Sequence, residues 1–178
     1  MEIGAVGSRQ YCHGFYPMGI VICTDPVSDP VPCDLRKLLD WSVNGGALFA
    51  CDYRVRALAI VTTRADGNSQ LPAGPTQPPL DPRSFVPFVS SSIGDAVQNH
   101  VGGARFFIVV DEYSMDPRSV GYESIVFVDR GPNGTFRAAR GTFQTAQAVL
   151  TLLTLAKLPF GHLQKTAYTC RDGIYGKF

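Results

Sequence analysis

The chain has 178 residues, of which 45% are hydrophobic and 17% are charged. This composition excludes a disordered chain, and the length suits a single compact domain spanning residues 1–178 with its own core. The formal net charge is only +1, so no strong basic field would attract nucleic acid or an anionic membrane surface, and we expect neither as a partner.

The N-terminal residues and the cysteines bear on where the protein resides. Residues 1–20 lack the basic start and apolar run of a signal peptide. The longest apolar tract, residues 148–160, is too short to span a bilayer. The five cysteines are an odd number, which favours reduced thiols over a disulfide framework. We therefore expect an intracellular, cytoplasmic protein.

The first half of the chain predicts two strands separated by a helix. Residues 18–24 and 55–63 are short apolar runs rich in β-branched side chains, as in buried strands. Between them, leucines at helical spacing predict a helix that begins at Asp34 and stops at Asn44-Gly45. Residues 64–89 contain six prolines and predict a long Pro-rich loop.

The second half predicts a helix, three strands and a longer helix. The segment around residues 92–102 carries a capping pair, Ser92 and Asp95, at its start. The expected strands that follow are residues 105–113, 123–130 and 135–140, the last two joined as a hairpin by Gly-Pro-Asn-Gly.

The C-terminal third predicts one long helix and one short strand. Residues 141–159 are apolar on nearly every side in their second half, which indicates a central, buried helix that Pro159 ends. The tail after this helix is expected to form a last strand with a turn at Asp172-Gly173. The whole order predicts an α+β (or α/β) fold: a mixed, mostly antiparallel sheet of about five to six strands, packed with about three helices.

Motifs for phosphate-bearing cofactors and for metals do not occur in the sequence. Neither Gly-rich phosphate-binding pattern is present, and both Gly-Gly pairs follow predicted helices instead of opening them. Cys12-His13, Cys23 and Cys33 lack the close pairing of zinc ligands. We therefore expect no cofactor and no metal.

One arrangement suits nucleophilic catalysis. Cys33 stands just before a predicted helix, where the helix dipole favours a thiolate. His100 and Asp111 follow in the order Cys, His, acid of a papain-like cysteine hydrolase. His100 also falls on the apolar face of its own helix, as a core histidine would, so both interpretations stay open. A weaker pairing joins His162 with Cys170 and Asp172.

Two further groups of residues are candidates for binding. Asp111, Glu112 and Asp129 come at or just past the ends of apolar strands, where ligands gather in open α/β sheets. They are equally consistent with polar residues that simply end strands. Three aromatic residues near the N-terminus suit an interface or a cover over the core: Tyr11, Phe15 and Tyr16.

These observations favour a non-enzymatic binding or assembly protein that acts through protein–protein contacts or self-association. Twelve arginines against four lysines are consistent with an interface, since arginine suits paired and interfacial positions. We also consider a viral or phage origin. The alternatives are the cysteine hydrolase using Cys33, His100 and Asp111, and a sensor or sequestering protein that holds a small ligand between the sheet and residues 64–89.

Overall fold

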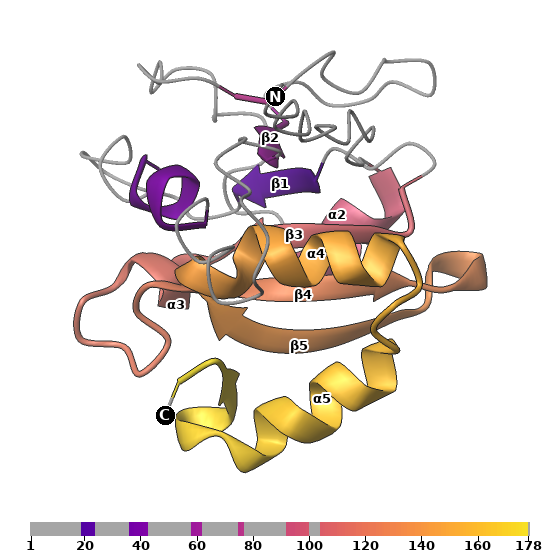
Figure 1. Cartoon of the computed structure of the whole chain (residues 1–178). Helices are drawn as coiled ribbons and strands as arrows, with labels where there is room; N and C mark the ends of the chain where they lie inside the picture. The colour runs from indigo at the N-terminus through magenta and orange to yellow at the C-terminus, as the bar shows by residue number, and fades with distance from the viewer. Residues whose placement is uncertain are drawn as a thin grey trace, which may run out of the picture.

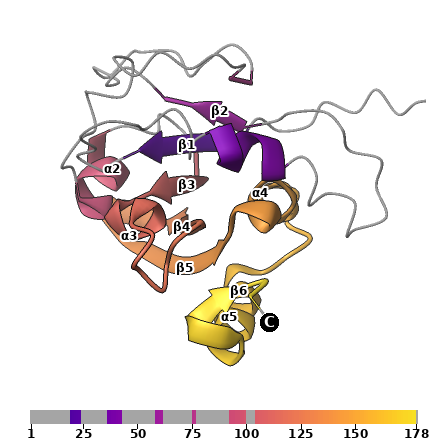
Figure 2. The same cartoon turned by 90° about the vertical axis from the view of Figure 1, so that its left-hand side faces the viewer.

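The computed structural model describes residues 19–23, 36–42, 58–61, 75–76, 92–99 and 104–177. At its centre lies a six-stranded sheet in the order β2-β1-β3-β4-β5-β6 (Figures 1 and 2). Four strands have five or more residues, and the short β2 and β6 lie at the two edges. The strands are β1 (Gly19–Cys23), β2 (Leu58–Ile60), β3 (Phe106–Val110), β4 (Ser124–Arg130), β5 (Phe136–Thr142) and β6 (Ile174–Tyr175).

The sheet is mixed, which confirms the predicted α+β class. β1 runs parallel to β2 and to β3, and β6 runs parallel to β5. The two longest ladders, β3–β4 and β4–β5, are antiparallel. The expectation of a mostly antiparallel sheet thus describes the β3–β4–β5 part, and the strands at the edges add parallel pairs.

Helices lie on both faces of this sheet. One helical segment comprises residues 36–42, and the others are α2 (Ile93–Asn99), α3 (Glu112–Met115), α4 (Ala146–Thr154) and α5 (Phe160–Thr169). The segment 36–42 and α4 lie on one side, α2 and α3 on the other, and α5 lies beside β5 and β6 (Figure 2). The expected number of about three helices was too low, because α3 and α5 were both expected as other structure.

The expected long helix over residues 141–159 is wrong. β5 extends to Thr142, the 3-10 turn Phe143–Thr145 follows, and α4 ends at Thr154. Ala156 adopts a left-handed backbone with φ of 55°, and the amides of Ala156 and Lys157 donate to the carbonyls of Leu153 and Leu152. This pattern is a Schellman motif, which ends the helix with alanine in the place that glycine usually takes.

Pro159 begins a helix, contrary to the prediction that it only ends one. It is the N-cap of α5, and its missing N–H costs nothing there because the first amides of a helix lack intrahelical acceptors. Phe160, Leu163 and Ala167 are buried on one face of α5. The last strand and the turn at Asp172-Gly173 follow as expected, both turn residues having positive φ.

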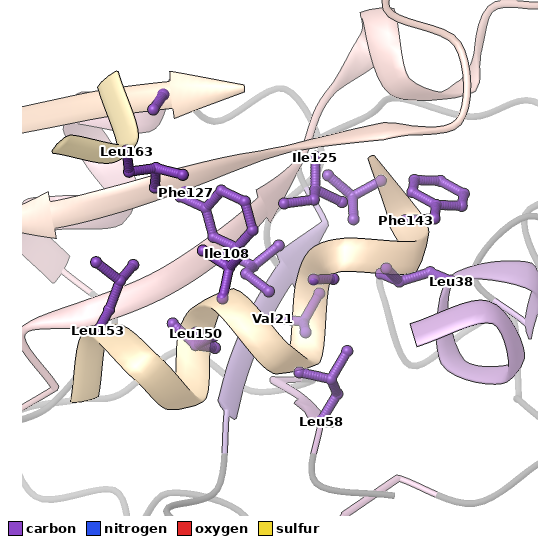
Figure 3. Packing of buried hydrophobic residues seen from close by; sticks show 14 of the residues in the cluster. Val21, Leu38, Leu58, Ile108, Ile125, Phe127, Phe143, Leu150, Leu153 and Leu163 are labelled. Atoms are coloured by element: carbon purple, nitrogen blue, oxygen red, sulfur yellow. The ribbon is translucent and has the colours of Figure 1, made fainter. Parts of the chain in front are cut away.

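Two apolar clusters hold the helices against the sheet. The larger lies on the α4 side and contains Val21, Ile108 and Phe127 from three neighbouring strands (Figure 3). The smaller lies on the α2 side and contains Val97 with Phe107 and Val109. Side chains of β3 therefore alternate between the two clusters, as the pleat requires, and this sheet is buried on both faces where β3 runs.

The predicted local signals at α2 and at the hairpin are confirmed. The Asp95 amide donates to Ser92 Oγ at 3.1 Å, and the Ser92 amide donates to the Asp95 carboxylate at 3.0 Å, which is a capping box. The turn Pro132–Gly134 joins β4 to β5, with Asn133 in the left-handed region at φ 58°. The antiparallel pairing of β4 with β5 places Asp129 opposite Arg137.

Of the predicted Pro-rich loop 64–89, the structure describes only Pro75 and Thr76. The Thr76 amide donates to the Leu58 carbonyl at 3.0 Å, and the Ile60 amide donates to Thr76 Oγ1 at 2.8 Å. Thr76 therefore lies against the outer edge of β2. The expectation of one domain over residues 1–178 remains a prediction.

Candidate functional site: an arginine pocket at one end of the sheet

Several predicted site residues lie outside the part of the chain that the structure describes. These are Tyr11, Phe15, Tyr16, Cys33 and His100. The three predicted carboxylates, Asp111, Glu112 and Asp129, are described, and they do not form one site. β4 runs antiparallel to β3, so the end of β4 that carries Asp129 lies at the opposite end of the sheet from Asp111 and Glu112. Antiparallel neighbours end at opposite edges of a sheet, so the carboxylates at the ends of β3 and β4 are separated.

Asp111 belongs to an enclosed network. The expected strand 105–113 stops at Val110, and Asp111 caps α3 by accepting from the amide and the hydroxyl of Ser114 at 3.0 and 2.7 Å. The Arg140 guanidinium donates to both carboxylate oxygens and, at 3.0 Å, to Ser124 Oγ. The Asp111 carboxylate is thus engaged by a helix cap and an arginine, and adjacent Glu112 is exposed in the first turn of α3.

Asp129 lies at the other end of β4 between two arginines. Arg105 Nε donates to Asp129 Oδ1 at 2.8 Å, and the Nε of Arg137 donates to Asp129 Oδ2 at 3.1 Å. Each guanidinium makes a second hydrogen bond to Oδ2. The Asp129 side chain is only 4% exposed, whereas those of Arg105 and Arg137 are 64% and 50% exposed. One buried carboxylate therefore anchors two guanidinium groups that face solvent.

The guanidinium groups of the same two arginines also contact aromatic rings. The guanidinium carbon of Arg105 lies 4.8 Å from the centre of the Phe106 ring, and that of Arg137 lies 5.2 Å from the centre of the Phe160 ring. The two rings stack on each other, with centres 6.5 Å apart and planes 14° apart. Cation–π contacts of this kind restrict the guanidinium planes, so both arginines are held by a carboxylate and by a ring.

The protonation state of Asp129 follows from its partners. Burial alone would raise the pKa of the carboxyl group, but the hydrogen bonds and the charges of Arg105 and Arg137 outweigh burial, and the pKa lies below its ordinary value. The same pairing raises the pKa of Arg105. Asp129 is therefore a carboxylate at neutral pH, which makes it an acceptor for the two guanidiniums and no source of a proton.

A pocket of about 590 Å³ opens over this cluster. We call it the arginine pocket and define it by Arg105, Arg130 and Arg137 around Asp129, with Pro132, Thr135 and Phe136 also in its lining. Among the described residues of this lining, Arg105 and Arg137 share the single carboxylate of Asp129. Its volume is in the range of sites that hold small ligands or single side chains of a partner.

A second cavity of about 750 Å³ lies between α5, the turn after β5 and the C-terminal segment. Cys170 lines it, together with three threonines. Its charged residues are paired: Glu123 with Lys37 at 3.2 Å, and Lys177 with Asp172 at 2.8 Å. His162 does not line this cavity, and among the described residues no hydrogen bond joins His162 to Cys170. The weaker predicted pairing of these two residues thus gains no geometric support.

Sequence analysis singled out Asp129 but missed both arginines that it anchors. Arg137 was within reach of sequence reasoning, because the hairpin around Gly-Pro-Asn-Gly sets residue 137 across from residue 129. Arg105 precedes its strand by one residue, and its contact with Asp129 depends on the tertiary pairing of Phe106 with Asp129. No local pattern in the sequence reports that pairing.

Comparisons with protein-family models, with curated proteins and with solved structures found no match to this chain. Within the described ranges, no helix is long and apolar enough to cross a membrane. The same ranges contain no group of three or more His, Cys, Asp or Glu side chains placed to hold a metal ion.

Proposed function

We propose that this protein is a non-catalytic binding protein that holds an acidic segment of a protein partner in the arginine pocket. One observation carries the proposal: a single buried carboxylate, Asp129, fixes two half-exposed guanidiniums, Arg105 and Arg137. Guanidinium groups bind carboxylates and phosphates through pairs of parallel N–H donors, which suits them to acidic partners. Because the donors are already oriented, a ligand loses less free energy to ordering them.

A protein partner is favoured over nucleic acid by the distribution of charge. The chain as a whole carries a net charge of only +1, so it has no strong overall basic field that would attract nucleic acid. Nucleic-acid affinity depends on many phosphate contacts and on an extended basic surface. A local arginine cluster is typical of sites that recognise acidic or phosphorylated motifs.

The test uses fluorescent peptide pools with degenerate flanks. One pool has a central Asp-Glu pair and the other a central Asn-Gln pair, and anisotropy measures their binding to the full chain. We expect the acidic pool to bind and the amide pool to bind at least tenfold more weakly. The double variant Arg105→Ala/Arg137→Ala should lose binding to the acidic pool at least tenfold.

The matched control is Arg118→Ala, because the Arg118 side chain is 91% exposed and pairs only with neighbouring Asp116 among the described residues. This variant should bind the acidic pool like the original protein. Equal binding of both pools, or binding that survives the double substitution, would contradict the proposal. Sedimentation at increasing concentration tests self-association separately: a particle that grows with concentration, and fails to grow in the double variant, would identify the partner as a second copy.

The cysteine hydrolase remains an untested alternative. Its nucleophile and histidine, Cys33 and His100, lie outside the described residues. Its third member, Asp111, has its carboxylate engaged by Arg140 and Ser114, an arrangement that serves a helix cap. Labelling with a thiol reagent at mildly acid pH separates the two functions: selective labelling of Cys33, lost in His100→Ala, would favour the enzyme.

We propose that the protein resides in the cytoplasm, where thiols stay reduced. The thiol of Cys170 is free, and the remaining cysteines are expected to be reduced as well. The small-ligand alternative retains the second cavity beside Cys170 as its candidate site, in a different place from the sheet–loop site expected from sequence. A thermal-shift screen of metabolites and nucleotides, repeated on Cys170→Ser, would test that alternative.

A further inference from the structure

We infer that Phe160 is a positioning residue of the arginine pocket, and that through it the binding of an acidic ligand is coupled to the packing of α5 on the sheet. This inference rests on the proposed function and adds the regulation of the same site by a helix. One contact carries it: the guanidinium carbon of Arg137 lies 5.2 Å from the centre of the Phe160 ring.

Five side chains around the pocket contact one another in a closed circuit. Asp129 binds Arg105 and Arg137, each guanidinium lies over a phenylalanine ring, and the rings of Phe106 and Phe160 stack. Strand pairing sets Asp129 opposite Phe106 on β3 and opposite Arg137 on β5. Phe160 is instead the first residue of α5, so its place in the circuit depends on the packing of that helix.

The two arginines are held differently by Asp129. Arg105 forms a fork, with Nε on Oδ1 at 2.8 Å and Nη2 on Oδ2 at 3.5 Å. Both bonds of Arg137, from Nε and Nη2, converge on the single oxygen Oδ2. A fork fixes a guanidinium by two separate oxygens, whereas a guanidinium held at one oxygen can still pivot about it. Arg137 therefore depends more on its second contact, the ring of Phe160.

The Phe160 ring restrains the pivoting of Arg137. Cation–π attraction favours a guanidinium that stays over the ring face, so the ring sets the tilt that the bonds to Oδ2 leave open. The same bonds leave Nη1 of Arg137 to other acceptors. We therefore expect the direction in which Nη1 meets an acidic ligand to depend on Phe160.

The packing of α5 determines where the Phe160 ring lies. Phe160 is 3% exposed and belongs to the larger apolar cluster together with Leu163. Gln164 Nε2 donates to the Ala138 carbonyl at 3.0 Å, which ties α5 to β5 one residue after Arg137. Opening of the start of α5 would withdraw the ring from Arg137. Because coupling between two equilibria is reciprocal, a ligand that binds the positioned Arg137 more tightly must also stabilise the packed α5.

The experiment measures the affinity of ring variants for the Asp-Glu peptide pool by anisotropy. Phe160→Leu keeps a large apolar side chain but lacks the ring, and we expect it to bind at least threefold more weakly. Phe160→Tyr keeps the ring and should restore most of the affinity. Phe106→Leu should cost less than Phe160→Leu, because Arg105 keeps its fork to Asp129. Phe143→Leu, which removes a buried ring that contacts Trp41, is the control and should bind normally.

A double-mutant cycle separates positioning from general loss of packing. If Phe160 acts through Arg137, Phe160→Leu should cause no further loss of affinity in the Arg137→Ala background, where Arg105 retains residual binding. A purely structural effect of Phe160→Leu would instead repeat in full in that background. Thermal unfolding of each variant records changes in stability separately from affinity.

Amide hydrogen exchange tests the coupling in the original protein, without any substitution. A saturating concentration of the acidic pool should slow exchange in α5 more than in α2, which lies on the other side of the sheet (Figure 2). This extra protection of α5 should be absent in Phe160→Leu. Since the first part of the measurement needs no variant, it decides the inference even if Phe160→Leu fails to fold.

Each other outcome has a defined meaning. Normal binding of the acidic pool by folded Phe160→Leu overturns the inference and leaves the proposed function standing. The same holds for an undiminished loss in the Arg137→Ala background, and for equal slowing of exchange in α5 and α2. No binding of the acidic pool to the original protein overturns both the inference and the proposed function.

Discussion

Two aspartate–arginine clusters stand at opposite ends of β4 and differ in both charge balance and exposure. At one end, Arg140 and Asp111 pair one to one, with side chains 23% and 15% exposed, and the network also includes Ser124. At the other end, Asp129 serves two arginines whose side chains are at least half exposed. The same chemical groups therefore form a mostly buried, one-to-one ion pair at one end of β4, and at the other end they leave positive charge exposed to solvent.

Charge balance and exposure distinguish an ion pair that only stabilises the fold from one that has charge available to a partner. In the Asp111 cluster the charges balance and the carboxylate also caps α3, so the cluster has no surplus charge for a partner. In the Asp129 cluster the carboxylate is the buried member and the arginines are the exposed ones. Under the proposed function, the exposed parts of these arginines are the groups that would contact a partner.

The largest expected effect on stability comes from removing the arginine of the Asp111–Arg140 cluster. Arg140→Met keeps the length of the side chain but leaves the mostly buried Asp111 without its counter-charge, and we expect stability to fall by about 3–5 kcal/mol. Chemical denaturation measures this loss. Arg118→Met, at a surface pair, should change stability by about 0.5 kcal/mol or less. A loss below 1 kcal/mol in Arg140→Met would contradict the structural role that we assign to the Arg140–Asp111 pair.

A smaller effect is expected from the carboxylate at the exposed end. Asp129→Asn keeps the shape of the side chain but removes charge from four hydrogen bonds, and we expect a loss of about 1–3 kcal/mol. The loss is smaller than that at Arg140 because the arginines released can be hydrated. The control is Asp116→Asn, at an exposed pair. If Asp129→Asn cost more than Arg140→Met, the contrast between the two ends would have the wrong sign.

The pH dependence of stability sharpens the comparison further. Because the pKa of Asp129 in the folded protein lies below its ordinary value, its carboxylate stabilises the fold above about pH 4, the ordinary range of an aspartic acid. This contribution is lost as the pH falls through the folded pKa. The stability difference between the original protein and Asp129→Asn should thus be constant from pH 5 to 7 and shrink below pH 4. A difference that grows on acidification would contradict the assigned direction.

The smallest effect on stability is expected at Phe136 in the lining of the arginine pocket. Phe136 is partly exposed and lies in neither apolar cluster, so Phe136→Ser should change stability by about 0.5 kcal/mol or less. Binding of the acidic peptide pool should nevertheless fall by at least threefold. Phe127→Ala, at a fully buried position of the neighbouring strand, is the contrasting variant, with an expected loss of about 3–5 kcal/mol.

Sequence patterns predicted the strands of this fold better than its helices. The strands are runs of apolar residues whose period matches a sheet buried on both faces, and all six expected strand regions contain a strand. The end of α4 was missed because alanine, not glycine, adopts the left-handed conformation at Ala156. The start of α5 was missed because Pro159 was taken as a stop, although a proline can also begin a helix.

The candidate site was predicted in part. Asp129 was singled out for the end of its strand, but for a reason that applies to parallel strands, and β4 is antiparallel to β3. The arginines could not be recognised from local patterns because Arg105 lies 24 residues from its partner along the chain. Charge surplus at a pocket is a property of the tertiary arrangement, and sequence composition reports only the balance of the whole chain.

The contact of Thr76 with β2 has a consequence for aggregation. An uncovered strand edge presents free amides and carbonyls to which another chain can add a strand. Thr76 occupies this edge with one backbone donor and one side-chain acceptor, and its hydroxyl takes the place of the carbonyl that a further strand would offer. Among the described residues, Thr76 thus occupies the edge of the sheet at Leu58–Ile60 against the addition of another strand, and Thr76→Val would remove the hydroxyl that accepts from the Ile60 amide.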